Sequence, residues 1–377
     1  MNIGFVLILC GAVFLHSCGI TKNKNGNKEV EDFVVKQIGV KNQYPVSPDR
    51  FKALIKIDNC QSLTVNAKSI KEFKTQTDGS KTAEAVISEQ DVLNYKTSLK
   101  LKVKMMFKSK DKQRFANGVI DGLSYTPAAL VKHKNQPEVK MTYEQYRAKI
   151  LTESKKQEAA SFLQQNLQTL LQIEQKYGVD KEVLVALFAM ESGLGKVKGK
   201  HVISDALFSL ALQSKRRDFF ENELLTLIKL MYYNVGLDQN LQGSWAGAFG
   251  FVQFMPSTFL KFAVDFDGDG FIDLFTPKDA LASAANYLMS IGWQFKKPIA
   301  KNKDIDLQNI CLAGSKIKDD SNEDAYLITP DKELSLNTKL GLVAYGNYFT
   351  LLDWNRSLYF ATSVAELSQF LAGGEQK

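Results

Sequence analysis

The sequence predicts a mainly α-helical protein with a small β-containing part near the N-terminus. From about residue 141 onward, apolar residues recur at the three- and four-residue spacing of helices. Between Leu99 and Met105, by contrast, apolar residues alternate with lysines, a spacing typical of a strand. The chain has 377 residues, of which 45% are hydrophobic and 11% aromatic, so it can bury a sizeable core.

The first 18 residues have the features of an export signal. Residues 3–15 are apolar but too short to span a bilayer comfortably, as in the core of a signal peptide. The residues LHSCG that follow resemble a bacterial lipobox, in which Cys18 carries the lipid after cleavage. An ordinary signal peptide and a buried helix are the alternatives. Residues 19–44 are polar and are expected to form a tether.

Residues 45–115 are expected to form a small β-containing subdomain whose role the sequence does not reveal. Leu99, Leu101, Val103 and Met105 alternate with three lysines, which predicts a half-buried strand. We interpret its lysine-lined face as a protected sheet edge rather than a binding surface. Strand-like segments near 51–57 and 83–88 would complete the subdomain.

Helices are predicted through the rest of the chain. Residues 142–177 read as long amphipathic helices, and Asp180 is expected at the N-cap of the next helix, which carries Glu191. Further helices are predicted over 204–213, 216–234, 256–264, 278–291, 337–351 and 358–373.

Charge and cysteine content limit the function classes. The net charge is +7, from 48 Lys and Arg against 41 Asp and Glu, and the lysines are scattered. Such a bias favours anionic polymers or surfaces, but no basic run interleaved with aromatic residues indicates nucleic-acid binding. Beyond the signal and Cys18, only Cys60 and Cys311 remain, which permits a disulfide without establishing one. With three histidines and no CxxC, a structural zinc site is not expected.

Glu191 is the first candidate catalytic residue. Val183, Leu184, Leu187 and Phe188 share one helix face, and Glu191 occupies the next step of that stripe. Burial disfavours the ionised carboxylate, so the pKa of Glu191 should rise. This suits a general acid; the alternative is a buried ion pair with a lysine such as Lys196.

The segment DFDGDGFID indicates a cation-binding loop. Asp265, Asp267 and Asp269 occupy positions 1, 3 and 5 of an EF-hand-type loop. Gly270 permits the sharp turn, and Phe271 is placed to offer its carbonyl oxygen. Because clustered aspartates repel one another without a cation, we expect a structural calcium ion there. No organic cofactor is expected.

The segments MESGLGKVKGKHVISDALFSLALQSKRRDFFENEL and GSWAGAFGFVQFMPSTFLKFAVDFDGDGFIDLFTPKDALASAANYL resemble the membrane-bound lytic transglycosylase B family of peptidoglycan-cleaving enzymes. The resemblance runs from about Gly118 to about Leu367. It implies a lysozyme-like catalytic domain over residues 116–377 and assigns the role of acid and then base to Glu191. It also implies that Asp279 closes the calcium loop.

The same resemblance implies the residues that bind the glycan. In DWNRSLYFA a tryptophan stands where the family commonly has tyrosine, which keeps a stacking face but lacks the phenolic hydroxyl. The substrate-binding residues implied are Arg216, Arg217, Ser244, Gln253, Tyr287, Trp354 and Asn355.

The leading hypothesis is therefore a lytic transglycosylase that forms 1,6-anhydromuramoyl ends at the bond between MurNAc and GlcNAc. Its expected partners are peptidoglycan strands, a membrane through the lipid anchor, and other cell-wall enzymes. Its expected location is the bacterial envelope, facing the periplasm, with the outer membrane favoured by Gly19 after Cys18. A muramidase-type hydrolase, with Asp205 as the nearest second carboxylate, and a catalytically silent peptidoglycan-binding module are the alternatives.

Overall fold

The computed structural model describes residues 87–127, 141–233, 237–304, 316–317, 324–330 and 340–373. The predicted signal with Cys18, the tether, the strand over 51–57, and both Cys60 and Cys311 lie outside the described residues.

The strand predicted over Leu99 to Met105 is wrong, because this segment belongs to helix α3 (Glu89–Met106). The helix starts at a capping box in which the Ser88 hydroxyl accepts the Asp91 N–H and the Asp91 carboxylate accepts the Ser88 N–H. Leucine, lysine and methionine are also good helix formers, so local propensity favours a helix over the alternating pattern. Leu99 and Val103 are fully buried against the core.

Helix α4 (Lys110–Gly122) runs beside α3, and it also contacts α11. The boundary predicted between residues 115 and 116 thus falls inside a helix. The described end of the range 45–115 is helical, and its buried side chains share a core with the rest of the chain.

The remaining helices follow the predicted ranges closely as far as residue 290. They are α6 (Tyr143–Ile150), α7 (Glu153–Gln165), α8 (Leu167–Tyr177), α9 (Lys181–Ser192), α10 (Ile203–Gln213), α11 (Arg217–Tyr232), α12 (Pro256–Phe262), α13 (Pro277–Ser290), α15 (Gly346–Trp354) and α16 (Leu358–Leu371).

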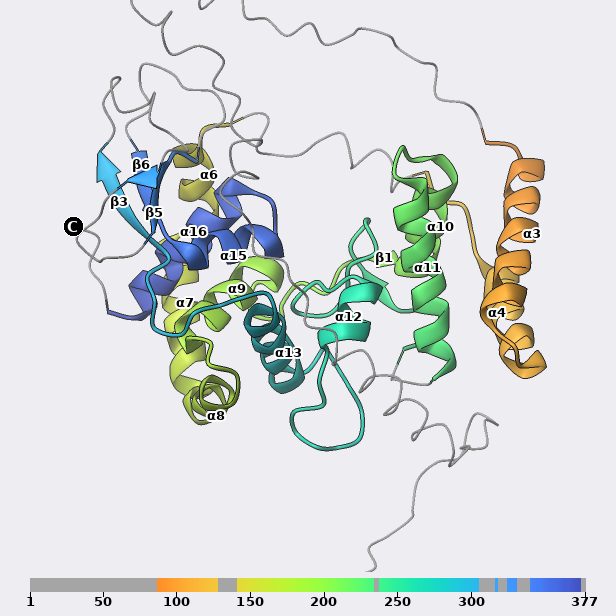
Figure 1. Cartoon of the computed structure of the whole chain (residues 1–377), viewed down its shortest axis with the longest axis horizontal. Helices are drawn as coiled ribbons and strands as arrows, with labels where there is room; N and C mark the ends of the chain where they lie inside the picture. The colour runs from red at the N-terminus through yellow and green to blue at the C-terminus, as the bar shows by residue number, and fades with distance from the viewer. Residues whose placement is uncertain are drawn as a thin grey trace, which may run out of the picture.

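Helix α9 is the central element of the larger group of helices, shown at the left of Figure 1. Residues 183–189 are all buried, so the helix is apolar on every side rather than along one stripe. Helices α7, α8, α13 and α16 pack around it. A second group, with α3, α4, α10 and α11, lies at the right, and α12 stands between the two groups (Figure 1).

Asp180 occupies the N-cap position of α9, as predicted, but its side chain makes no capping hydrogen bond. Its carboxylate instead accepts the Trp293 indole N–H at 3.1 Å and pairs with the Lys296 ammonium. The N-cap carboxylate therefore ties α9 to the segment after α13.

Two antiparallel sheets accompany the helices. The two-stranded sheet pairs β1 (His201–Val202) with β2 (Gln242–Gly243). The four-stranded sheet has the order β3-β6-β5-β4. Its strands are β3 (Ala300–Asp304), β4 (Lys316–Ile317), β5 (Ala325–Ile328) and β6 (Leu340–Ala344).

The four-stranded sheet corrects the helix predicted over 337–351. Residues 340–344 form β6, which pairs with both β3 and β5, and the helix α15 starts only at Gly346. Period-based reasoning favoured one long helix because the run is apolar, but short apolar runs fit a buried strand equally well. In the described part of the chain, no helix is both long and apolar enough to cross a membrane.

Candidate active site

Glu191 lies in the last turn of α9, and a tight left-handed turn follows it. Gly193, Leu194 and Gly195 all have positive φ, at 57°, 61° and 84°. The Leu194 N–H donates to the carbonyl of Phe188 at 3.2 Å, which closes the end of the helix. Leucine rarely adopts this conformation, so the turn holds local strain directly behind the candidate acid.

The carboxylate of Glu191 is held by one strong hydrogen bond. The indole N–H of Trp354, at the end of α15, donates to Glu191 Oε1 at 2.8 Å. Burial raises the pKa of Glu191 to about 7, although the Trp354 hydrogen bond lowers it. At neutral pH the carboxyl group is therefore about half protonated, which suits a group that gives and then takes a proton.

The alternative of a buried ion pair between Glu191 and Lys196 is wrong. The Lys196 ammonium pairs with Glu158 at 2.5 Å, and the two side chains are largely exposed. Glu191 itself is only partly accessible to solvent.

Aromatic rings surround the Glu191–Trp354 pair. Tyr287 from α13 lies 5.1 Å from Trp354, and Phe254 lies 5.6 Å from it, both measured between ring centroids. Phe262 stacks on Tyr287 at 4.6 Å. Tyr287 and Trp354 are half-buried, whereas Phe254 is buried against both rings. Half-buried rings next to a protonatable carboxyl group form a surface on which sugar rings can stack.

Ser244 and Gln253 order the backbone of the glycine-rich loop, residues 243–254. The Ser244 hydroxyl accepts the backbone N–H groups of Ala246 and Ala248, at 3.3 and 3.0 Å. The Gln253 amide donates to the carbonyl of Gly250 at 2.8 Å. The backbone of Gln253 also has a positive φ of 51°, which is unusual for residues other than glycine or asparagine. Both residues are half-buried and order the loop.

Glycines let the separate motifs pack against one another. An added Cβ at Gly195 would lie 3.1 Å from the ring of Phe251, and one at Gly250 would lie 2.4 Å from the Cβ of Leu274. The Phe251 N–H also donates to the Leu274 carbonyl at 2.8 Å. The glutamate turn, the glycine-rich loop and the end of the acidic loop are thus in direct contact.

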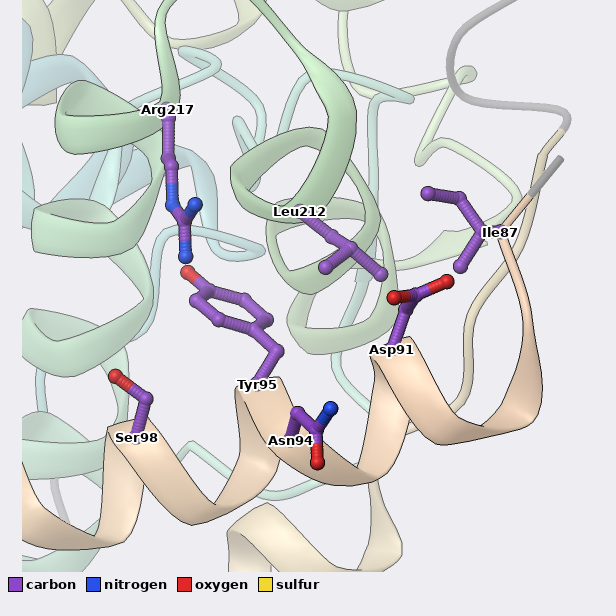
Figure 2. A pocket seen from close by; sticks show the side chains of 7 residues that line it. All are labelled: Ile87, Asp91, Asn94, Tyr95, Ser98, Leu212 and Arg217. Atoms are coloured by element: carbon purple, nitrogen blue, oxygen red, sulfur yellow. The ribbon is translucent and has the colours of Figure 1, made fainter. Parts of the chain in front are cut away.

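Arg216 and Arg217 lie at the start of α11, and both guanidinium groups contact aromatic rings. The guanidinium of Arg216 lies 4.1 Å from the ring of Phe219. The guanidinium of Arg217 lies 4.8 Å from the ring of Tyr95 in α3. Figure 2 shows Arg217 pointing at Tyr95 across an open pocket that α3 lines together with Leu212.

The remaining candidates, Asn355 and Asp205, each take part in a hydrogen bond with a backbone group. Asn355 follows Trp354 directly and ends α15, where its N–H donates to the Leu351 carbonyl. Asp205 accepts the Ser124 N–H at 2.8 Å and so anchors the segment after α4 to α10. This contact gives Asp205 a structural role.

The acidic loop between α12 and α13 brings three carboxylates together. Oxygen atoms of Asp265, Asp267 and Asp279 all lie within 4.8 Å of one another. Burial, and the charges of Asp267 and Asp265, raise the pKa of Asp279, although two backbone N–H groups donate to it. Asp269 lies outside this group of three, because its carboxylate accepts the Phe271 N–H at 2.8 Å.

Comparison with known protein families identifies the family of this chain. The family model of the transglycosylase SLT domain matches residues 97–369, which is more than half of the chain. The chain belongs to the transglycosylase SLT family.

One curated relative from this family is the membrane-bound lytic murein transglycosylase B of Escherichia coli K12, which is 34% identical over 241 residues. The match covers 60% of this chain and 66% of that protein, slightly less than two thirds of its length.

Solved structures of SLT-type transglycosylases share the fold. SltB3 from Pseudomonas aeruginosa, in complex with NAG-NAM-pentapeptide, is 26% identical with a TM-score of 0.67, over 76% of this chain and 80% of that one. The lytic transglycosylase Slt35 of E. coli, in complex with calcium, is 27% identical with a TM-score of 0.61, over 75% and 92% of the two chains.

Within this SLT-family chain, sequence reasoning missed the role of the Trp354 indole. The sequence analysis assigned this tryptophan a stacking face and left a hydrogen bond open, yet its indole N–H reaches Glu191. An indole nitrogen is a donor only, so it suits a carboxylate partner. The ring stack of Phe262 on Tyr287 also gave no signal in the sequence.

Proposed function

We propose that this chain is a lytic transglycosylase that cleaves the β-1,4 bond between MurNAc and GlcNAc in peptidoglycan without water. The observation that carries the proposal is the Glu191 carboxyl group, with a pKa of about 7, held by Trp354 beside half-buried rings. Family membership and the names of the relatives support the same activity.

Glu191 would act twice in this reaction. Protonated Glu191 gives its proton to the glycosidic oxygen, and the bond between that oxygen and the anomeric carbon breaks. The C6 hydroxyl of the same muramoyl residue then attacks the anomeric carbon and forms the 1,6-anhydro ring, while the Glu191 carboxylate takes the hydroxyl proton. The group returns to its starting form, so one carboxyl group suffices.

The Glu191 carboxyl group has the properties that this reaction needs. Burial and the Trp354 hydrogen bond are the causes of its pKa shift. Glycosidases commonly use a second carboxyl group about 5 to 10 Å away, so the products distinguish this reaction from hydrolysis. A silent binding module would not need a buried acid of this kind.

Mass spectrometry of the products tests the proposal. Purified peptidoglycan is digested with the wild-type protein and with Glu191→Gln, which keeps the shape of the side chain but cannot donate the proton. We expect muropeptides one water lighter than hydrolytic products from the wild type, and none from the variant. Full-mass reducing products would favour a hydrolase, and no products from folded wild-type protein would favour a binding module.

The acidic loop is proposed to hold a structural calcium ion. The three carboxylate groups of Asp265, Asp267 and Asp279 fit such a site, because calcium prefers several carboxylate oxygens at about 2.3–2.6 Å. The carbonyl of Phe271 and the carboxylate of Asp269 stay predicted ligands. The ion would offset the mutual repulsion of the acids and fix the loop that contacts the active-site motifs through Leu274.

The location in the envelope is also a proposal. We infer export through residues 1–18 and lipid attachment at Cys18, with residues 19–44 as the tether and the outer membrane as the destination. The E. coli relative is named as membrane-bound. Incorporation of labelled fatty acid into the wild type, but not into Cys18→Ser, would support lipidation; equal labelling would contradict it.

A further inference from the structure

The end of α3 presents apolar side chains to solvent. Met105 is 78% exposed, Leu101 60% and Met106 37%. Leu101 and Met105 lie one helical turn apart, on the side of α3 opposite to the buried Leu99 and Val103. Nothing in the described part of the chain covers them, and a helix face of this kind is unusual on a surface without a partner.

Lysines surround these apolar side chains. Lys104, Lys108 and Lys110 are all exposed, and none of them forms an ion pair with the described residues. Of the acidic residues near this region, Asp111 pairs with Arg114 at 3.5 Å, and Glu221 pairs with Lys102. We call this surface, made of Leu101, Lys104, Met105, Met106, Lys108 and Lys110, the α3–α4 tip.

We propose that the α3–α4 tip docks on an anionic phospholipid surface. Apolar side chains ringed by lysines match the boundary between acyl chains and phosphate headgroups, because the apolar groups enter the first and the ammonium groups contact the second. Each lysine near an anionic surface strengthens binding about fivefold, and methionine adapts to a fluid partner.

The position of the tip leaves the active site free. Helix α3 forms one outer edge of the molecule, whereas α9 and α15, which carry Glu191 and Trp354, lie in the other group of helices (Figure 1). A chain docked through the tip would therefore rest on a membrane while the rings of Tyr287 and Trp354 remain open to a glycan. A basic contact of this kind would add to the membrane affinity of the lipid proposed at Cys18.

The inference does not rest on the proposed activity, because vesicle binding and peptidoglycan digestion are separate measurements. The experiment uses residues 19–377, which leave out the predicted signal and the predicted lipid-bearing Cys18. Flotation measures its binding to vesicles of phosphatidylethanolamine with phosphatidylglycerol, and to vesicles of phosphatidylcholine alone. The test variant is Leu101→Asp with Met105→Asp, both at exposed positions. The matched control is Leu171→Asp, which changes a leucine that is 45% exposed on α8.

We expect binding to the anionic vesicles, little binding to neutral ones, and at least a tenfold loss in the double variant. The control should bind as the wild type does, and all three proteins should have the same circular dichroism spectrum and the same Tm, which shows that they are folded. Absence of binding to anionic vesicles overturns the proposal. So does wild-type binding by the double variant, or an equal loss in Leu171→Asp. A chain that binds another protein through the tip, and no vesicles, likewise overturns it.

Discussion

Replacing Trp354 with phenylalanine should raise the pKa of Glu191. The change removes the indole N–H that donates to Glu191 Oε1 at 2.8 Å and keeps an aromatic ring against Phe254 and Tyr287. A hydrogen bond to a charged group contributes about 1.5–3 kcal/mol, and one pKa unit corresponds to about 1.4 kcal/mol. Because the protonated carboxyl group keeps part of this bond, we expect the pKa to rise by about one unit, from about 7 toward about 8.

The pH dependence of kcat/KM for peptidoglycan digestion measures this shift. The first step needs protonated Glu191, so activity falls as the pH rises through its pKa. In Trp354→Phe the alkaline limb should move up by about one pH unit. A carbon NMR titration of the Glu191 carboxyl group reports the same pKa without reference to activity.

Tyr287→Phe is the matched control. It removes a hydroxyl from the same group of rings, where the phenol donates to the Asp353 carbonyl at 3.4 Å rather than to Glu191. Its alkaline limb should coincide with that of the wild type. If the limb and the NMR titration of Trp354→Phe also coincide with the wild type, the indole does not set the acidity of Glu191 and the reasoning is refuted.

Three further predictions concern stability. Glu191 has a folded-state pKa of about 7, above its unfolded value of 4.5, so its contribution weakens the fold as the pH rises between these values. In urea unfolding, Glu191→Gln should therefore be more stable than the wild type by up to about 3 kcal/mol at pH 7.5 and nearly equal at pH 4; a constant difference would argue against the shift. Calcium should raise the Tm of the wild type, because it binds the folded chain. Asp267→Asn should lose most of this rise, whereas the control Asp273→Asn, at an exposed position, should keep it. An equal rise in Tm in both variants would exclude Asp267 as a ligand. Gly199→Ala should lower the free energy of unfolding by about 3 kcal/mol or more, because its Cβ would lie 2.2 Å from the Gly243 carbonyl oxygen. Gly178→Ala, at a position with positive φ but room for a Cβ, should lower it by about 1 kcal/mol. Equal losses of stability in thermal unfolding would show that the structure relieves the close approach at Gly199.

The parts of the fold that the sequence predicted well have local signals. Helix α9 was recognised because a long apolar run ends at a glycine turn, and α13 because its periodicity is regular. Glu191 was singled out as the candidate acid because a carboxylate on an apolar helix has few other roles. The acidic loop was singled out because its spacing matches that of a cation-binding loop.

The parts that were missed depend on contacts distant in sequence. The alternation from Leu99 to Met105 fits a strand until the capping box at Ser88 and Asp91 is included, and that box starts a helix. Strand β6 is defined by its partners β3 and β5 rather than by its own pattern. The hydrogen bond from Trp354 to Glu191 joins residues 163 positions apart, so no local pattern could predict it.

The surroundings of Arg217 also depend on a distant element. Its role as a glycan contact stays a prediction. Its guanidinium lies against Tyr95, in a helix that was predicted as a strand, so the sequence could not predict this contact.

The most direct test of the account is whether water enters the product. Peptidoglycan is digested by the wild-type chain in water enriched in heavy oxygen, and the newly formed muramoyl ends are analysed by mass spectrometry. If Glu191 alone transfers the proton while the C6 hydroxyl attacks, the new ends carry no heavy oxygen. Heavy oxygen at the new anomeric carbon would mean that water is the nucleophile, and it would contradict the single-carboxylate mechanism.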